Sequence, residues 1–191
     1  MAKTAKRREI SEYPWQRKKD YLLLVAAVAA ADGALPEEEL SLLNRWMDTF
    51  ELPEKSRSEV MGAARQEPLQ LQSILGRLAK TDLVYSLMLD MMGMAMADGV
   101  LQDNEIALLR EMAAGLNVDQ IDFKILIEFV HSAHQASQLS NPEPLYEHNI
   151  DSAFELLRKR KVRLFPHTLL CATSLSYDEQ LKKRWAKFLA S

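Results

Sequence analysis

The sequence predicts an all-α protein, and three observations lead to that fold class. Apolar residues recur at helical spacing along most of the 191-residue chain. No run of alternating β-branched residues is long enough to compete as a strand. A short acidic motif with an apolar helical pattern on each side occurs twice. With 48% apolar and 27% charged residues, the composition is that of a globular protein with one sizeable core.

The first two predicted helices flank the first copy of that motif. Pro14 suits the first position of a helix that continues through apolar residues to Ala31. Gly33 is expected to end this helix in the left-handed conformation. A second helix starts at Pro36 and carries an apolar stripe at i, i+3, i+4 and i+7, which consists of Leu43, Trp46, Met47 and Phe50.

Further helices are expected up to residue 138. They span 53–66, 68–79, 82–97 and 118–138, and Leu109, Met112, Ala113 and Leu116 repeat the apolar stripe before the last of them. The 82–97 helix concentrates five of the nine methionines: Met88, Met91, Met92, Met94 and Met96. Such a cluster favours a pliable core, and the alternative is a groove for a hydrophobic ligand or a partner helix.

An internal repeat organises the chain. Residues 29–43 align with residues 95–109 at a constant offset of 66, and eight of these 15 positions are identical. The likeness continues downstream, where Phe50 corresponds to Leu116. The sequence therefore predicts a bundle built from two pseudo-symmetric helix-loop-helix units that pack face to face.

Charge divides the chain into three segments. Residues 1–19 carry a net charge of +5, residues 20–139 carry −11 and residues 140–191 carry +3. The proline-rich stretch 141–144 also indicates a boundary near residue 140. We therefore expect a basic N-terminal arm, an acidic repeat core and a C-terminal extension.

The extension is expected to be helical and to dock on the core. Helices are predicted over 146–161, 166–174 and 176–189, the last with a capping-box pattern at its start. A segment this short cannot bury its own apolar side chains. Those expected to need burial are Leu156, Leu157, Leu164, Phe165, Leu169, Leu170 and Phe188.

The doubled motif resembles the TerB-like family, which includes tellurite-resistance proteins and the N-terminal domain of a DnaJ-type co-chaperone. The residues that carry the likeness are Ala31-Asp32-Gly33, Leu35 and Glu39, and again Ala97-Asp98-Gly99, Leu101 and Glu105. The resemblance covers about residues 20–138. It implies an all-helical bundle with its repeats face to face, ion binding by the acidic residues and a place in a stress response.

Independently of the family, the spacing of the acidic residues fits oxygen ligation. Asp-Gly-x-Leu-x-x-x-Glu matches the second half of an EF-hand loop. Loop positions 1 and 3 would be apolar residues that cannot ligate calcium, so a standard EF-hand is excluded. If the two loops approach each other, we expect one shared calcium or magnesium site with the ligands Asp32, Glu39, Asp98 and Glu105.

The alternative for these residues is a purely structural role. Glu39 and Glu105 fall in the first turns of helices, where a negative side chain complements the helix dipole by about 0.3–1 kcal/mol. Asp32 and Asp98 would accept hydrogen bonds from free backbone N–H groups there. The two roles are compatible, and the sequence leaves both open.

The sequence favours a binding or scaffolding module over an enzyme. It contains no Ser/His/Asp or Cys/His nucleophile arrangement, no glycine-rich phosphate loop and no Cys-x-x-Cys pair. Glu128-x-x-His131 occurs once, whereas a di-iron bundle needs two such motifs. We therefore expect a protein partner. The alternative is a membrane-peripheral or nucleic-acid-associated adaptor that uses the basic clusters at 158–161 and 182–184.

A cytoplasmic location is expected. The apolar run 21–31 after Lys18 and Lys19 imitates a signal peptide, but its cleavage-like pattern recurs at 95–105 inside the chain. The run is also shorter than the ~20 residues needed to span a bilayer. The single cysteine, Cys171, is compatible with a reducing compartment.

Overall fold

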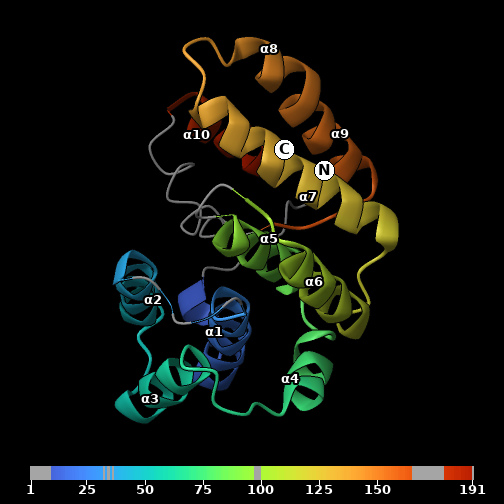
Figure 1. The fold of residues 1–191 in the computed structure, drawn as a ribbon. Coiled ribbons are helices and arrows are strands. Elements are labelled where there is room, and N and C mark those ends of the chain that lie inside the picture. Colours follow the sequence, from blue (N-terminus) through green and yellow to red (C-terminus); the bar gives the residue numbers. More distant parts are fainter. Residues whose placement is uncertain are drawn as a thin grey trace.

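The structure is a computed structural model that describes residues 10–31, 33, 35, 37–96, 100–164 and 179–190. Every regular element within these ranges is helical, as the sequence predicts (Figure 1). None of the helices found there is both long and apolar enough to cross a membrane.

The first repeat unit comprises three helices, and the first of them is central and largely buried. A short η1 (Ile10–Glu12) precedes α1 (Trp15–Ala29), which is followed by α2 (Glu37–Thr49) and α3 (Glu54–Ala63). Helix α1 contacts both α2 and α3, and α4 (Leu71–Leu78) packs against it as well. Pro14 is the N-cap of α1 rather than its first helical residue, because its ψ of 142° is extended.

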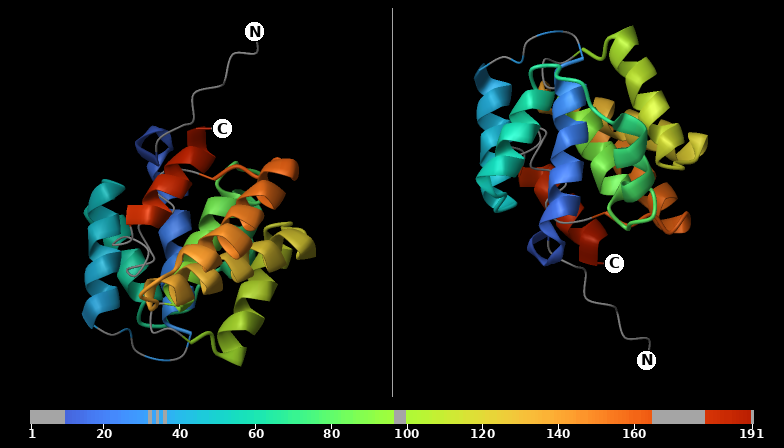
Figure 2. Two further views of the ribbon diagram at one scale, coloured as in Figure 1. Left: turned by 90° about the horizontal axis from the view of Figure 1, so that it is seen from above. Right: turned by 90° about the horizontal axis from the view of Figure 1, so that it is seen from below.

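The second repeat unit has the same order of helices. It consists of α5 (Val84–Ala95), α6 (Asp103–Gly115) and α7 (Gln120–Ser137). Helix α5 packs against α1, α6 and α7, and Figure 2 shows α1 and α5 between α2 and α3 on one side and α6 and α7 on the other. The five clustered methionines on and just after α5 are all buried, which confirms that they belong to the core.

Helix boundaries recur at the offset of 66 that the sequence repeat shows. Helices α2 and α6 correspond at both ends, α1 and α5 at their last residue, and α3 and α7 at their first. The left-handed residue after α2, Glu51 with φ of 52°, corresponds to Asn117 after α6, with φ of 59°. The spatial pseudo-symmetry of the two units stays a prediction.

The end of α1 differs from the expectation. The helix stops at Ala29, because the N–H groups of Ala30 and Ala31 already close it by hydrogen bonds to the carbonyls of Ala26 and Val28. Gly33 therefore lies beyond the cap. Its φ of +148° is not the left-handed helical value that we predicted, although it is still a conformation that favours glycine.

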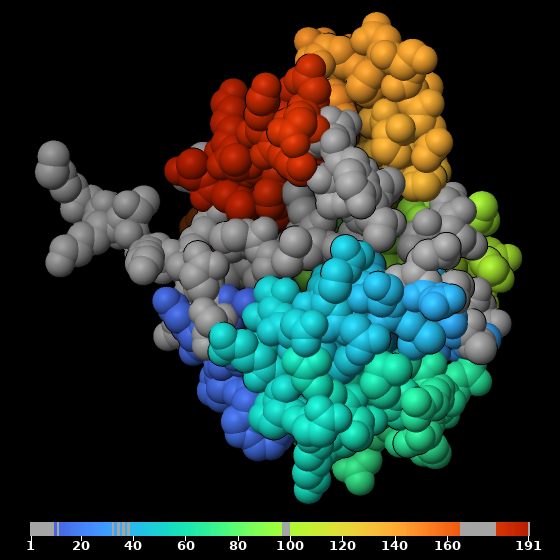
Figure 3. Space-filling model, turned by 90° about the vertical axis from the view of Figure 1, so that its left-hand side faces the viewer, coloured from blue at the N-terminus to red at the C-terminus, as the bar shows by residue number. Residues whose placement is uncertain are grey.

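The C-terminal part packs on α7. Three helical elements follow one another, α8 (Glu143–Leu145), η2 (Tyr146–Ile150, a π-helical turn) and α9 (Asp151–Lys159), and η2 and α9 both contact α7. The last helix is α10 (Glu179–Ala190). In the view of Figure 3 it lies above α2 and α3. Four aromatic rings join α7, α9 and α10 with centroid distances of 4.7–6.2 Å: Phe129, Phe154, Trp185 and Phe188.

Burial in this part is partly as expected. Leu157, Leu164 and Phe188 are buried, which confirms three of the predicted positions. The prediction for Leu156 is wrong, because its side chain is 46% exposed. Phe165, Leu169 and Leu170, the predicted 166–174 helix and the capping residues before α10 lie outside the described residues. The division of the chain at residues 19 and 139 stays a prediction.

Candidate functional site

The four predicted metal ligands are only partly within the described structure. Asp32 and Asp98 lie outside the described residues. Glu39 and Glu105 occupy the third positions of α2 and α6, which are equivalent in the repeat, and Glu105 is only 6% exposed. Within the described ranges, no three or more His, Cys, Asp or Glu side chains are grouped so that they could hold a metal ion. The shared ion site therefore stays a prediction.

Glu105 has a structural contact of the kind expected for a helix cap. Its carboxylate accepts a hydrogen bond of 2.8 Å from the backbone N–H of Gln102, the N-cap residue of α6. This bond satisfies one of the donors that the start of a helix leaves without an intrahelical partner. The structural role thus has direct support at Glu105, and a second role as an ion ligand is compatible with it.

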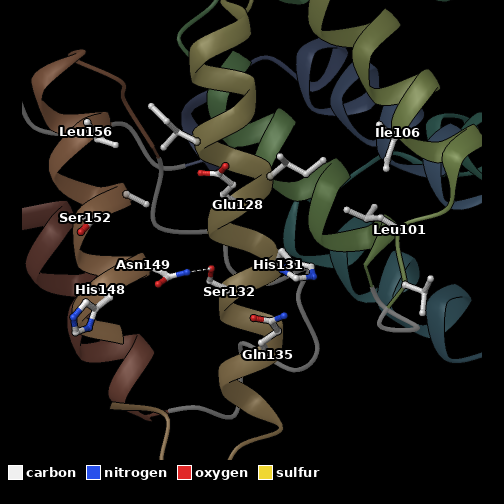
Figure 4. A pocket seen from close by; sticks show the side chains of 14 residues that line it. Leu101, Ile106, Glu128, His131, Ser132, Gln135, His148, Asn149, Ser152 and Leu156 are labelled. Carbon is white, nitrogen blue, oxygen red and sulfur yellow. Dashed lines mark hydrogen bonds between the residues drawn. The ribbon is translucent and has the colours of Figure 1, made fainter. Parts of the chain in front are cut away.

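A larger feature of the second unit is a groove along the outer face of α7. The hollow has a volume of about 850 Å³ and lies between the start of α6 on one side and η2 and α9 on the other. Figure 4 shows Glu128, His131 and Gln135 of α7 in its middle. This volume is within the range of sites that hold small molecules or parts of a partner chain.

On the polar side of this groove, one hydrogen bond joins two of its walls and another lies within one wall. Asn149 of η2 donates from Nδ2 to the Ser132 hydroxyl of α7 over 3.1 Å, and Figure 4 shows this bond as a dashed line. The Nδ1 atom of His148 lies 2.9 Å from the carbonyl oxygen of Pro144, four residues earlier. These bonds tie η2 to α7 and to its own preceding turn, so one wall of the groove is held in place.

The apolar side of the groove includes two strongly exposed side chains. Val100, before α6, is 62% exposed and Leu156, on α9, is 46% exposed, and both line the hollow. Large apolar side chains that gather around a concave surface indicate a binding site more often than isolated ones do. This site was not predicted from the sequence, because Leu156 was expected to be buried.

Helix α7 carries a buried carboxylate, Asp122, that joins it to other parts of the chain. Asp122 is 3% exposed, accepts a 2.7 Å hydrogen bond from the Tyr85 hydroxyl and pairs with Arg160, which follows α9. Burial, and next the hydrogen bond to Asp122, raise the pKa of Tyr85 to about 12. Because Arg160 also reaches Asp119 over 3.1 Å, this cluster connects the end of α9 to the start of α7.

Comparison with known proteins identifies the family of this fold. The family model described as tellurite resistance protein TerB matches residues 22–126, which is more than half of the chain and includes both copies of the motif. No curated protein and no solved structure matches the chain. The resemblance inferred from the repeated motif is thereby confirmed, and the chain belongs to the TerB family.

Proposed function

We propose that this TerB-family chain is a non-catalytic binding or scaffolding module that uses the groove beside α7 to hold a protein partner. The observation that carries the proposal is the 850 Å³ hollow with Val100 and Leu156 exposed at its walls. Its lining contains one charged side chain, Glu128, among apolar and neutral polar groups. Protein interfaces typically combine apolar contact area with polar groups in this way. A role in a stress response, such as tellurite resistance, is part of this proposal.

The test is to find peptide binders and to locate where they bind. A displayed library of segments from proteins of the same organism is selected against the full chain, and each enriched segment is measured again on variants. Val100→Ser with Leu156→Ser should weaken binding at least tenfold. Leu139→Ser is the matched control, because Leu139 is 49% exposed and lies outside the groove. Binders that respond equally to both sets of variants would contradict the proposal.

We also propose that a divalent cation, calcium or magnesium, stabilises the repeat pair through Asp32, Glu39, Asp98 and Glu105. The equivalent positions of Glu39 and Glu105 at the starts of α2 and α6 support it. A ligand that binds only the folded state raises stability by RT ln(1 + [L]/Kd), about 2.7 kcal/mol at 100 times Kd. Millimolar ion should therefore raise the melting temperature above its value in chelator, and Asp32→Asn with Asp98→Asn should abolish the rise. No rise in the wild type would leave only the capping role.

A second candidate function is contact with an anionic surface through the basic C-terminal helices. Between α9 and α10 lies a cleft of about 310 Å³, lined by Arg158, Lys183, Arg184 and Lys187 with only two acidic side chains. Lys183 and Lys187 are one turn apart, and both are exposed. Lys183→Glu with Lys187→Glu should abolish salt-dependent binding to anionic vesicles, whereas Arg45→Glu with Lys55→Glu, the same charge change at exposed positions of the first unit, should preserve most of it. Absence of vesicle or DNA binding by the wild type would remove this candidate.

A further inference from the structure

A second hollow lies between α6 and α7 and adjoins the groove. It has a volume of about 730 Å³ and shares the lining residues Ile106 and Ile127 with the groove. Its other apolar residues come from the end of α6 and the start of α7: Ala113, Ala114, Val118 and Phe123. We call this hollow the α6–α7 groove. With the first hollow it forms a concave strip along α7 that is lined by apolar and polar residues.

The charged residues of the α6–α7 groove all have the same sign. Arg110 of α6 and Lys124 of α7 line it, and no acidic residue does. Arg110 makes no ion pair within the described residues, and Lys124 reaches Glu128 at 3.8 Å with both side chains mostly exposed. An exposed pair of this kind contributes little stability, so both cations are available to an incoming group. The groove therefore complements a partner that is apolar and negatively charged.

The first repeat unit has an ion pair at the equivalent place. Asp48 of α2 and Arg57 of α3 pair over 2.7 Å, and Arg57 also donates from Nε to the Leu52 carbonyl oxygen over 2.9 Å. At the offset of 66, this pair corresponds to Ala114 and Phe123, which line the α6–α7 groove. The second unit thus presents apolar surface where the first unit satisfies its charges internally.

The cations of the second unit also have no charged counterpart in the first. Arg110 corresponds to Asn44, and Lys124 corresponds to Ser58. The second unit therefore has apolar residues where the first unit has an ion pair between two helices. It also has cations at two positions where the first unit has neutral residues. Both changes favour binding of an outside segment with apolar and acidic side chains.

We propose that an amphipathic helix of a partner protein binds along the α6–α7 groove, with its apolar face on Ile106, Val118 and Ile127 and its acidic side chains at Arg110 and Lys124. The inference rests on the proposed function, because it specifies the partner that the module holds. Together, the α6–α7 groove and the adjoining groove are lined by residues of α7 from Gln120 to Gln135, about 23 Å at 1.5 Å per residue. This length suits a helix of about four turns, whose side-chain ridges pack between those of α6 and α7.

The test uses two synthetic probes and the full chain. One probe is a 16-residue amphipathic helix with an apolar stripe and two glutamates near one end, and its twin has lysines in place of the glutamates. Binding is measured by fluorescence anisotropy. Arg110→Glu with Lys124→Glu should weaken the acidic probe at least tenfold and strengthen the lysine twin. Arg45→Glu with Lys55→Glu, the same charge change at exposed positions of the first unit, should change neither probe more than twofold.

A second variant tests the apolar floor without touching a buried residue. Ala114 is exposed, so Ala114→Trp should fill the groove, preserve the helical circular dichroism spectrum and reduce binding of the acidic probe at least tenfold. Equal binding of both probes to the wild type, or equal effects of the two charge-reversal pairs, would overturn the inference. A stable dimer that dissociates in Arg110→Glu with Lys124→Glu would overturn it as well, because a second copy of the chain would then be the occupant.

Failure of this inference and failure of the proposed function give different results. In one case, Val100→Ser with Leu156→Ser weakens the binding of library segments, but neither probe discriminates between the charge variants. The proposed binding function is then retained, and only the inference of an acidic helical partner fails. If no library segment depends on Val100 or Leu156, the proposed function itself fails.

Discussion

The two repeat units have corresponding helices, but they differ in the size of a hollow that lies against the third helix of each unit. A cavity of about 320 Å³ in the first unit and the groove of about 850 Å³ in the second have five equivalent lining positions. These pairs are Leu35 and Leu101, Leu40 and Ile106, Met61 and Ile127, Arg65 and His131, and Gln66 and Ser132. A hollow with the same lining positions is thus small in one copy and large in the other.

The length of the third helix explains much of this difference. Helix α3 ends at Ala63, where the Glu67 N–H bonds back to the Gly62 carbonyl and Pro68 prevents continuation. The residue equivalent to Pro68 is His134, and α7 continues to Ser137, eight residues beyond the position equivalent to the end of α3. The longer helix supports η2 and α9, which form the second wall of the groove.

Local hydrogen bonding also restricts the first cavity. Beyond α3, Gln66 has φ of 62° and donates from Nε2 to the Ala30 carbonyl oxygen over 2.6 Å. Ser132, its equivalent, is within α7 and accepts from Asn149 instead. The two units thus differ in two ways: the third helix of the second unit is longer, and a further segment packs beside it.

The largest expected effect tests whether the two units contribute equally to the core. Leu43 and Leu109 are equivalent and both have 0% exposure. Leu43→Ala and Leu109→Ala should each lower the free energy of unfolding by about 2–5 kcal/mol, because each leaves a cavity in packed surroundings. Urea unfolding should show values within about 1 kcal/mol of each other. A loss below about 1 kcal/mol for one of them would show that the units are not equivalent in the core.

The next effect concerns two buried carboxylates that pair with arginines, Asp20 of α1 and Asp122 of α7. Asp20 of α1 is 1% exposed and accepts hydrogen bonds of 2.7 and 2.8 Å from Arg77 of α4. Arg77→Ala should cost about 2 kcal/mol, less than the 3–5 kcal/mol of a fully buried pair, because Arg77 is half exposed. Arg160→Ala should cost less, since Asp122 keeps the Tyr85 hydroxyl as a donor at 2.7 Å, whereas Asp20 keeps the longer 3.0 Å bond from the Gln16 side-chain amide. Thermal melts of both variants would contradict this account if Arg160→Ala were the more destabilising.

A smaller effect is expected for the ion pair that distinguishes the first unit from the second. Asp48 is 69% exposed, so its pairing with Arg57 contributes at most about 1 kcal/mol to folding. Arg57→Ala should therefore lower the free energy of unfolding by about 0.5–1 kcal/mol, part of it from the lost bond to the Leu52 carbonyl. Chemical denaturation of this variant, beside Arg45→Ala as a control in the same unit, measures it. A loss above about 3 kcal/mol would mean that the pair is a major support of the first unit.

The last effect is absent at neutral pH, and it is an alkaline pH dependence that involves Tyr85 of the second unit. The pKa of Tyr85 in the folded chain is about 12, above the unfolded value of about 10. A raised pKa means that the folded state holds the phenolic proton more tightly, so this stabilisation is complete below about pH 10 and declines as the pH rises toward 12. Tyr85→Phe should remove that decline. An ultraviolet titration in which Tyr85→Phe does not reduce the number of tyrosines that ionise near pH 12 would contradict the assignment.

Much of the fold could be predicted from the sequence. The apolar stripe on α2 and its repetition on α6 are periodic signals, and Pro53 and Asp119 are the N-caps of α3 and α7. Helix C-termini were predicted less well. The predicted 53–66 and 82–97 helices end at Ala63 and Ala95, because backbone bonds after the last turn decide these ends.

The candidate groove could not be predicted from periodicity. Its second wall depends on how η2 and α9 pack against α7, and contacts such as that between Asn149 and Ser132 join residues from different segments. One signal was nevertheless present in the sequence. Alignment of the two copies pairs Asp48 and Arg57 with Ala114 and Phe123, and this loss of opposite charges indicates that the second copy presents a different surface.

The most direct test of the central claim, that the second unit alone carries the partner surface, compares equivalent methyl groups in one NMR experiment. The full chain is methyl-labelled at isoleucine, leucine and methionine and titrated with the acidic helical probe. The account predicts shifts at Ile106 and Ile127 and none at their equivalents Leu40 and Met61. Equal shifts in both units, or none at Ile106 and Ile127 under conditions where the probe binds, would contradict it.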